Sequence, residues 1–143
     1  VIHSAQAFVP ALIKQDKPAM VINTGSKQGI TYPLGNPAYN VTKAGVRSLT
    51  ESSAHELLEL NDCPVSAHLL IPGFTYTGMI GGLYRKTPNR VDTNQVVDYM
   101  IEALSRGDVY ILCPNNDVTT EMDHRRIQWN VGDIVENRPA LSW

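Results

Sequence analysis

The chain has 143 residues, of which 43% are hydrophobic and 18% charged, and its formal net charge is −2. This composition predicts one globular domain with a buried core and excludes an intrinsically disordered chain. No apolar run approaches the roughly 20 residues of a membrane span, and lysine and arginine form no basic cluster for nucleic acid. Cys63 and Cys113 have neither a CxxC spacing nor a neighbouring histidine pair. We therefore expect no metal site, and a reducing, cytoplasmic environment.

The sequence alternates between helix-like and strand-like patterns. Apolar residues at helical spacing predict four helices, at residues 1–15, 37–60, 91–107 and 118–137. Continuous apolar runs closed by glycine or proline predict three buried strands, at residues 18–25, 64–73 and 108–114. Segments with several glycines and no clear period predict loops, at residues 26–36 and 74–90.

Prolines refine two of these helices. Pro10 interrupts the first one, so we expect a kink or a late start there. Asn36 and Pro37 are typical N-cap and first-turn residues, and they predict where the second helix begins. Because apolar strands alternate with helices, the predicted fold class is α/β, with a parallel sheet covered by helices on both faces.

Tyr39 and Lys43 lie four positions apart in the second predicted helix, so their side chains share one face. A free tyrosine has a pKa near ~10 and is a poor general base at neutral pH. A cation about 5 Å away, at an effective dielectric of about 20, stabilises the phenolate by roughly 3 kcal/mol. That is enough to bring the pKa to ~7–8, where a phenol exchanges protons productively. Tyrosine and lysine also occur at this spacing by chance in many helices, so the pair alone decides nothing.

The context of the pair is more informative. Ser26 directly follows the first predicted strand, and the second strand ends in a turn at Pro72 and Gly73. The carboxyl ends of parallel strands form the edge of the sheet at which ligands bind. Ser26 and Thr77 taken in isolation are ordinary turn residues; beside Tyr39 and Lys43, they favour a catalytic site.

With these residues the chain resembles the short-chain dehydrogenase/reductase family in its single-domain form. The resemblance rests on Ser26, on YNVTK at residues 39–43 with the AGV that follows, and on PGFTYT at residues 72–77. It covers residues 1 to about 114, and the segment from Val118 is less diagnostic. It implies a Rossmann-like parallel sheet of which only the C-terminal part, about three strands, is present. Residues 1–143 would then be the C-terminal part of one domain.

The resemblance also implies an activity and three catalytic residues. The enzyme would be an NAD- or NADP-dependent oxidoreductase that interconverts an alcohol and a carbonyl by hydride transfer. Tyr39 would be the acid/base, Lys43 would lower its pKa and hold the nicotinamide ribose, and Ser26 would orient the substrate oxygen.

Further roles follow from the same resemblance for the residues after the second strand. Pro72, Gly73 and Thr75 would border the nicotinamide, and Thr77 would touch its carboxamide or the diphosphate. The segment 74–90 is similar to the family's substrate loop. Its apolar and aromatic residues would shape the substrate pocket, and they suggest a lipophilic or aromatic small-molecule alcohol or ketone. These residues are Phe74, Tyr76, Met79, Ile80, Leu83 and Tyr84.

One family motif is missing. The glycine-rich TGxxxGxG turn that binds the cofactor pyrophosphate is found nowhere in these residues. We therefore expect the chain alone to be inactive and to bind nicotinamide cofactor weakly or not at all, with a bare edge on strand 18–25. The alternative function is that of a non-catalytic fragment acting as an assembly or interaction module.

The resemblance further implies a homodimer or homotetramer formed through helices 1–16 and 37–60. Phe8, Leu12 and Leu49 are the expected contributors, although helices of this length can equally be buried within one subunit.

The remaining charged and ionisable features are expected to be structural. Lys27 is expected to be a solvated loop lysine rather than a guide for an anionic substrate. The MDHRR segment at residues 122–126 is expected to be a solvated helix face rather than a phosphate site, and Trp129 to serve packing. The four histidines share no ligand spacing, so they are not expected to bind a metal.

Overall fold

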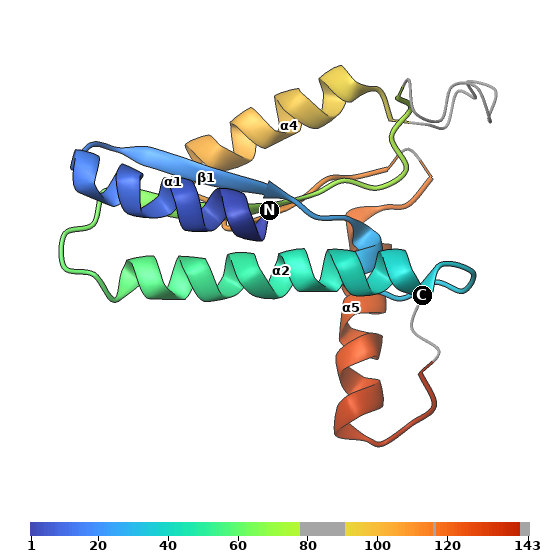
Figure 1. Cartoon of the computed structure of the whole chain (residues 1–143). Coiled ribbons are helices and arrows are strands. Elements are labelled where there is room, and N and C mark those ends of the chain that lie inside the picture. Colours follow the sequence, from blue (N-terminus) through green and yellow to red (C-terminus); the bar gives the residue numbers. More distant parts are fainter. Residues whose placement is uncertain (78–90, 116, 141–143) are drawn as a thin grey trace.

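The computed structural model describes residues 1–77, 91–115 and 117–140. In these parts, helices and strands alternate along the chain in the predicted order (Figure 1). The strands are β1 (Ala19–Thr24), β2 (Val65–Ile71) and β3 (Tyr110–Leu112). The helices are α1 (Ile2–Gln15), α2 (Pro37–Leu58), α4 (Thr93–Ser105) and α5 (Thr120–Val135), with a short 3-10 helix η1 (Lys27–Gly29).

The three strands form one parallel sheet in the order β1-β2-β3. β1 pairs with β2 from Ala19 opposite Val65 to Thr24 opposite Leu70. β2 is almost entirely buried because it has a strand on each side and helices above and below. The predicted α/β class with a parallel sheet is therefore confirmed.

Helices cover both faces of the sheet. α4 packs Val96 and Ala103 against Leu70 and Ile111 on one face. On the other face, Leu57 of α2 packs against β2, and partly buried side chains of α1 join the same cluster. Figure 1 shows this arrangement, with α4 on one side of the strands and with α1 and α2 running together on the other.

Local sequence accounts for where α2 begins. The Asn36 side chain accepts a hydrogen bond from the Tyr39 backbone N–H at 3.2 Å, and Pro37 occupies the first helical position. Farther along, the fully buried hydroxyl of Thr50 accepts a hydrogen bond from the Asn23 amide at 3.0 Å. This contact fixes α2 against β1 and so sets where the first turns of α2 lie relative to the end of β1.

Two details differ from the predictions. The segment 26–36 is not all loop, because the Ser26 hydroxyl accepts a hydrogen bond from the Gln28 N–H and caps η1. α1 begins at Ile2 and continues through Pro10, so a late start at that proline is wrong. A proline in the second turn or later removes one backbone hydrogen bond without necessarily ending a helix.

β1 lies at an edge of the sheet. Among the described residues it pairs only with β2, and Met20 and Ile22 on it are exposed. The expected bare edge is thus present in the described part of the chain. Within the same residues, no helix has the length and apolar character needed to cross a membrane.

Candidate active site

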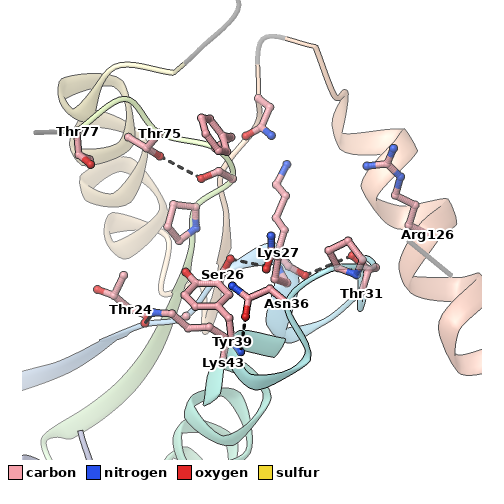
Figure 2. A pocket seen from close by; sticks show the side chains of 17 residues that line it. Thr24, Ser26, Lys27, Thr31, Asn36, Tyr39, Lys43, Thr75, Thr77 and Arg126 are labelled. Carbon is pink, nitrogen blue, oxygen red and sulfur yellow. Dashed lines mark hydrogen bonds between the residues drawn. The ribbon is translucent and has the colours of Figure 1, made fainter. Parts of the chain in front are cut away.

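A cavity of about 630 Å³ lies at the carboxyl ends of the three strands (Figure 2). The residues that follow each strand line it: Gly25 and Ser26 after β1, Gly73 after β2 and Asn115 after β3. Because the strands are parallel, their carboxyl ends meet at one edge, which is where open α/β sheets bind ligands. The fold therefore places a ligand-sized space where the sequence predicted one.

Tyr39 and Lys43 reach this cavity from the first turns of α2. The Lys43 Nζ lies 5.6 Å from the centroid of the Tyr39 ring, as expected for side chains one helical turn apart. It also donates a hydrogen bond to the Thr24 carbonyl at 2.9 Å. The ammonium is therefore held between the phenol and the end of β1.

Ser26 lines the same cavity, and Figure 2 shows it beside Tyr39 and Lys43. Its Oγ accepts a hydrogen bond from the Gln28 N–H at 3.2 Å. It donates to no other described residue, so its hydroxyl hydrogen is available to a ligand. The structure thus gathers all three predicted catalytic residues at one place.

The turn after β2 forms another wall. Pro72, Gly73, Phe74, Thr75 and Thr77 all line the cavity. The Thr75 hydroxyl donates to the Gly73 carbonyl at 3.2 Å, which tightens the turn. The wall is therefore held by contacts within the turn itself.

Gly73 leaves room for the side chain of Asn115. A Cβ at residue 73 would lie 1.9 Å from the Asn115 Oδ1, so a larger residue there would displace the Asn115 amide from its present position.

Some predicted substrate residues are not part of this wall. Tyr76 is not among the cavity-lining residues; its backbone N–H donates to the Val91 carbonyl at 3.0 Å. The predictions for Met79, Ile80, Leu83 and Tyr84 lie outside the described residues.

Sequence reasoning missed several lining residues, of which Asn115 and Gln28 are the most informative. The Asn115 Oδ1 and the Gln28 Oε1 are buried and have no hydrogen-bond partner among the described residues. Buried acceptors usually have a donor, so this pair fits a ligand that carries N–H or O–H groups. The position of Asn115 just after the third predicted strand was the signal that could have found it.

Lys27 is not a solvated loop lysine. Its Nζ donates to the Asp123 Oδ2 at 2.5 Å, and the two side chains are only 14% and 6% exposed. The prediction was wrong because α5 lies against η1 and takes the ammonium out of water, where it needs a counter-charge.

The predicted solvated face at residues 122–126 is correct only in part. His124 and Arg125 are exposed, and Arg125 pairs with Glu121. Asp123 is buried, however, and Arg126 lines the cavity. A helix face that looked polar in sequence is therefore divided between solvent and the cavity.

The cavity is positively charged. Three cations are among its described lining residues, namely Lys27, Lys43 and Arg126, and no carboxylate is among them. The buried Asp123 balances Lys27. A surplus of positive charge remains and favours ligands with anionic or strongly polar groups.

Comparison with known proteins assigns the family. The model of the short chain dehydrogenase family matches residues 1–88, more than half of the chain, so the chain belongs to that family. The 1-deoxy-11-beta-hydroxypentalenate dehydrogenase of Streptomyces avermitilis is 29% identical over 129 residues, which are 85% of this chain and 45% of that protein. The CLA biosynthesis dehydrogenase/reductase of Lactiplantibacillus plantarum is 27% identical over 78 residues, 54% of this chain and 27% of the relative.

Solved structures agree on the fold. A short-chain dehydrogenase/reductase from Burkholderia phymatum in complex with NAD superposes with a TM-score of 0.81 at 23% identity, covering 97% of this chain and 56% of that one. A short-chain dehydrogenase from Sphingobium yanoikuyae in complex with NADPH gives 0.69 at 19% identity, with 97% and 53% covered. The Rossmann-like fold is thus confirmed, and the chain spans about half the length of these proteins.

Proposed function

We propose that the chain carries the catalytic residues of an NAD- or NADP-dependent oxidoreductase that interconverts an alcohol and a carbonyl by hydride transfer. The observation that carries this proposal is the meeting of Ser26, Tyr39 and Lys43 at one cavity on the carboxyl edge of a parallel sheet. Relatives named as dehydrogenases, and similar structures that hold NAD or NADPH, support it.

The proton is handled by Tyr39. Its phenolic oxygen gives a proton to the substrate oxygen during reduction and takes one during oxidation. The Lys43 ammonium, 5.6 Å from the ring centroid, stabilises the phenolate that forms. Ser26 donates its free hydroxyl hydrogen to the same substrate oxygen, because its Oγ already accepts from Gln28.

The residues present fit a nicotinamide cofactor. Its carboxamide and ribose hydroxyls are hydrogen-bond donors, and the buried Asn115 Oδ1 and Gln28 Oε1 are acceptors without partners among the described residues. Lys43 would hold the ribose, Pro72 and Gly73 with Thr75 would border the ring, and Thr77 would reach the carboxamide or the diphosphate. When bound, the cofactor supplies or accepts the hydride.

The activity is proposed for a longer chain in which residues 1–143 form the C-terminal part of one domain. The chain covers 45% of the Streptomyces avermitilis relative and has no glycine-rich pyrophosphate turn. The cofactor would then depend on contacts from both parts of that domain, so residues 1–143 alone would bind it weakly or not at all.

Assembly and location complete the proposal. Phe8 is 66% exposed on α1, which supports a homodimer or homotetramer through α1 and α2. The same exposed apolar surface favours the alternative function, an assembly module without catalysis. The free thiols of Cys63 and Cys113 suit the cytoplasm.

The Tyr39→Phe variant of the full-length protein tests the function. We expect its turnover to fall about 10²- to 10⁴-fold, the usual contribution of a general acid–base group. Stability should be unchanged, because the Tyr39 hydroxyl has no hydrogen-bond partner among the described residues and the side chain is 39% exposed. Tyr32→Phe is the matched control, since Tyr32 is similarly exposed and does not line the cavity. Wild-type turnover in Tyr39→Phe would refute the enzymatic proposal and leave the assembly module.

A further inference from the structure

Arg126 is the one cation of the cavity, among its described lining residues, that no other group accounts for. Lys27 is neutralised by Asp123, and Lys43 is held by the Thr24 carbonyl beside Tyr39. Arg126 is half-buried and has no hydrogen bond or ion pair with any residue that the structure describes. No carboxylate is among the described residues that line the cavity. The positive charge and the N–H donors of the guanidinium are therefore available to a ligand.

The position of Arg126 is fixed by its neighbours on α5. Asp123 lies three residues before Arg126 and four residues before Ile127, so its side chain neighbours each of them on the helix surface. Asp123 is held by the buried ion pair with Lys27, and Ile127 packs against the cluster that contains Val46 and Ile71. The ion pair and the apolar contact hold this part of α5 beside the cavity that Arg126 lines.

Arg126 reaches the cavity from α5, on the side away from Thr75 and Thr77, which are two of the proposed cofactor contacts. In Figure 2, Thr75 and Thr77 lie on one side, Ser26 and Tyr39 lie below, and Arg126 projects from α5 on the other side of Lys27. A group bound by Arg126 would thus lie on the α5 side of the cavity, away from Thr75 and Thr77. That arrangement favours a distal part of the substrate over a phosphate of the cofactor.

We propose that Arg126 binds a carboxylate of the substrate, so that the enzyme acts on a hydroxy acid or keto acid whose carboxylate is remote from the reacting carbon. This inference rests on the proposed function and names its substrate class. The planar fork of a guanidinium matches a carboxylate through two parallel N–H···O bonds. A largely apolar substrate body fits beside it, since Phe74 forms part of the cavity wall.

A binding measurement on the full-length protein tests the proposal without any turnover. The probes are 3-phenylpropanoate and 3-phenylpropanamide, which have the same size and differ in charge, and their dissociation constants are measured by calorimetry. We expect the carboxylate to bind about 10-fold more tightly or better, as for a hydrogen bond to a charged group. In Arg126→Gln the two probes should bind within about 2-fold of each other, because the charge-assisted contact is gone.

Arg125→Gln is the matched control, because Arg125 is the adjacent arginine but is 75% exposed and paired with Glu121. It should keep the preference for the carboxylate. A wild-type protein that binds the carboxylate no better than the amide, including one that binds neither, overturns the proposal. So does an unchanged preference in Arg126→Gln.

A phosphate of the cofactor is the other group whose anionic oxygens Arg126 could bind. Both variants are therefore also titrated with NAD and NADP. If Arg126→Gln weakens the cofactor about 10-fold and leaves the carboxylate preference intact, Arg126 holds a cofactor phosphate and the substrate proposal is wrong. The Tyr39→Phe protein should retain the carboxylate preference. Its turnover tests the proposed function, and its binding preference tests the substrate proposal, so the two can fail independently.

Discussion

Cys113 directly follows β3 and is 1% exposed. Burial raises the pKa of its thiol from 9.0 to about 11, against a smaller lowering by the charge of Lys27. A thiol in this environment is almost entirely protonated near neutral pH, and only the thiolate is a good nucleophile. Cys113 is therefore a packing residue beside the cavity.

We expect iodoacetamide at pH 8 to modify Cys63 in the native protein and to leave Cys113 unmodified, as read by peptide mass spectrometry. Cys63 is only half-buried and serves as the internal control. Urea-denatured protein should be modified at both positions. Equal labelling of the two thiols in the native state would contradict the burial of Cys113.

The same pKa shift makes stability depend on pH in the alkaline range. The unfolded chain releases the Cys113 proton near the ordinary pKa of 9.0, whereas the folded chain holds it up to about 11. The contribution of this group is therefore complete below pH 9 and is lost as the pH rises toward 11. Cys113→Ala should reduce the fall in the free energy of unfolding between those pH values, measured by urea denaturation.

Gly29 is required where η1 meets α2. A Cβ at this position would lie 2.6 Å from the backbone carbonyl carbon and oxygen of Lys43, which cannot rotate away. We expect Gly29→Ala to lower the free energy of unfolding by about 1–3 kcal/mol, as overpacking does, and to disturb the site through Lys43.

Gly45→Ala is the control for this prediction, because Gly45 lies within α2 and a Cβ added there would meet nothing within 4 Å. Alanine there should stabilise the protein by about 0.5–1 kcal/mol through its helix propensity. Both variants are compared by urea unfolding. Equal stability of the two would refute the close approach at Gly29.

At the scale of elements, α5 is attached to the rest of the molecule by a buried charge. Asp123→Asn leaves the Lys27 ammonium, 14% exposed, without its counter-ion. We expect a loss of about 3–5 kcal/mol in the free energy of unfolding, because breaking one half of a buried pair strands the other charge.

Replacing both partners, as Lys27→Met with Asp123→Leu, should recover most of that loss, because no charge then remains buried. Glu121→Gln provides a surface control on the same helix: it breaks the exposed pair with Arg125 and should cost less than about 1 kcal/mol. An Asp123→Asn protein as stable as Glu121→Gln would show that α5 is held in some other way.

Most elements could be predicted because their signals are local. The Asn36-Pro37 start of α2 and the capping box between Asp92 and Gln95 at the start of α4 involve residues at most three positions apart. The docking of α5 could not be predicted, since it depends on an ion pair between residues 96 positions apart in the chain. From the sequence alone, Lys27 and the polar segment of α5 are both expected to be solvated. Lys27 and its partner on that segment are buried only because the fold brings them into contact.

At the scale of the whole molecule, the exposed apolar side chains of α1 bear on assembly. α1 has no fully buried residue, and Phe8 is 66% exposed. If α1 and α2 form a contact between subunits, Phe8→Glu should place charge in that contact and shift the protein to a smaller species. Analytical ultracentrifugation measures the change in mass.

Leu34→Glu controls for a general effect of added charge, because Leu34 is 90% exposed and precedes α2 in a loop. Its sedimentation should match that of the wild type. A Phe8→Glu protein with unchanged mass would place the subunit contact elsewhere, or show that the protein has none.

The sequence by itself determined the α/β order, the parallel sheet, the family resemblance and the shared face of Tyr39 and Lys43. The elements and the shared face depend on periodicity, on turn residues or on spacing within one element, and the resemblance depends on short motifs at residues 26, 39–43 and 72–77. Only the tertiary structure decided that Asn115 and Arg126 join Ser26 at one cavity, and that Lys27 is buried with Asp123. Burial and the pairing of charges depend on which distant segments come into contact, and no local pattern specifies that.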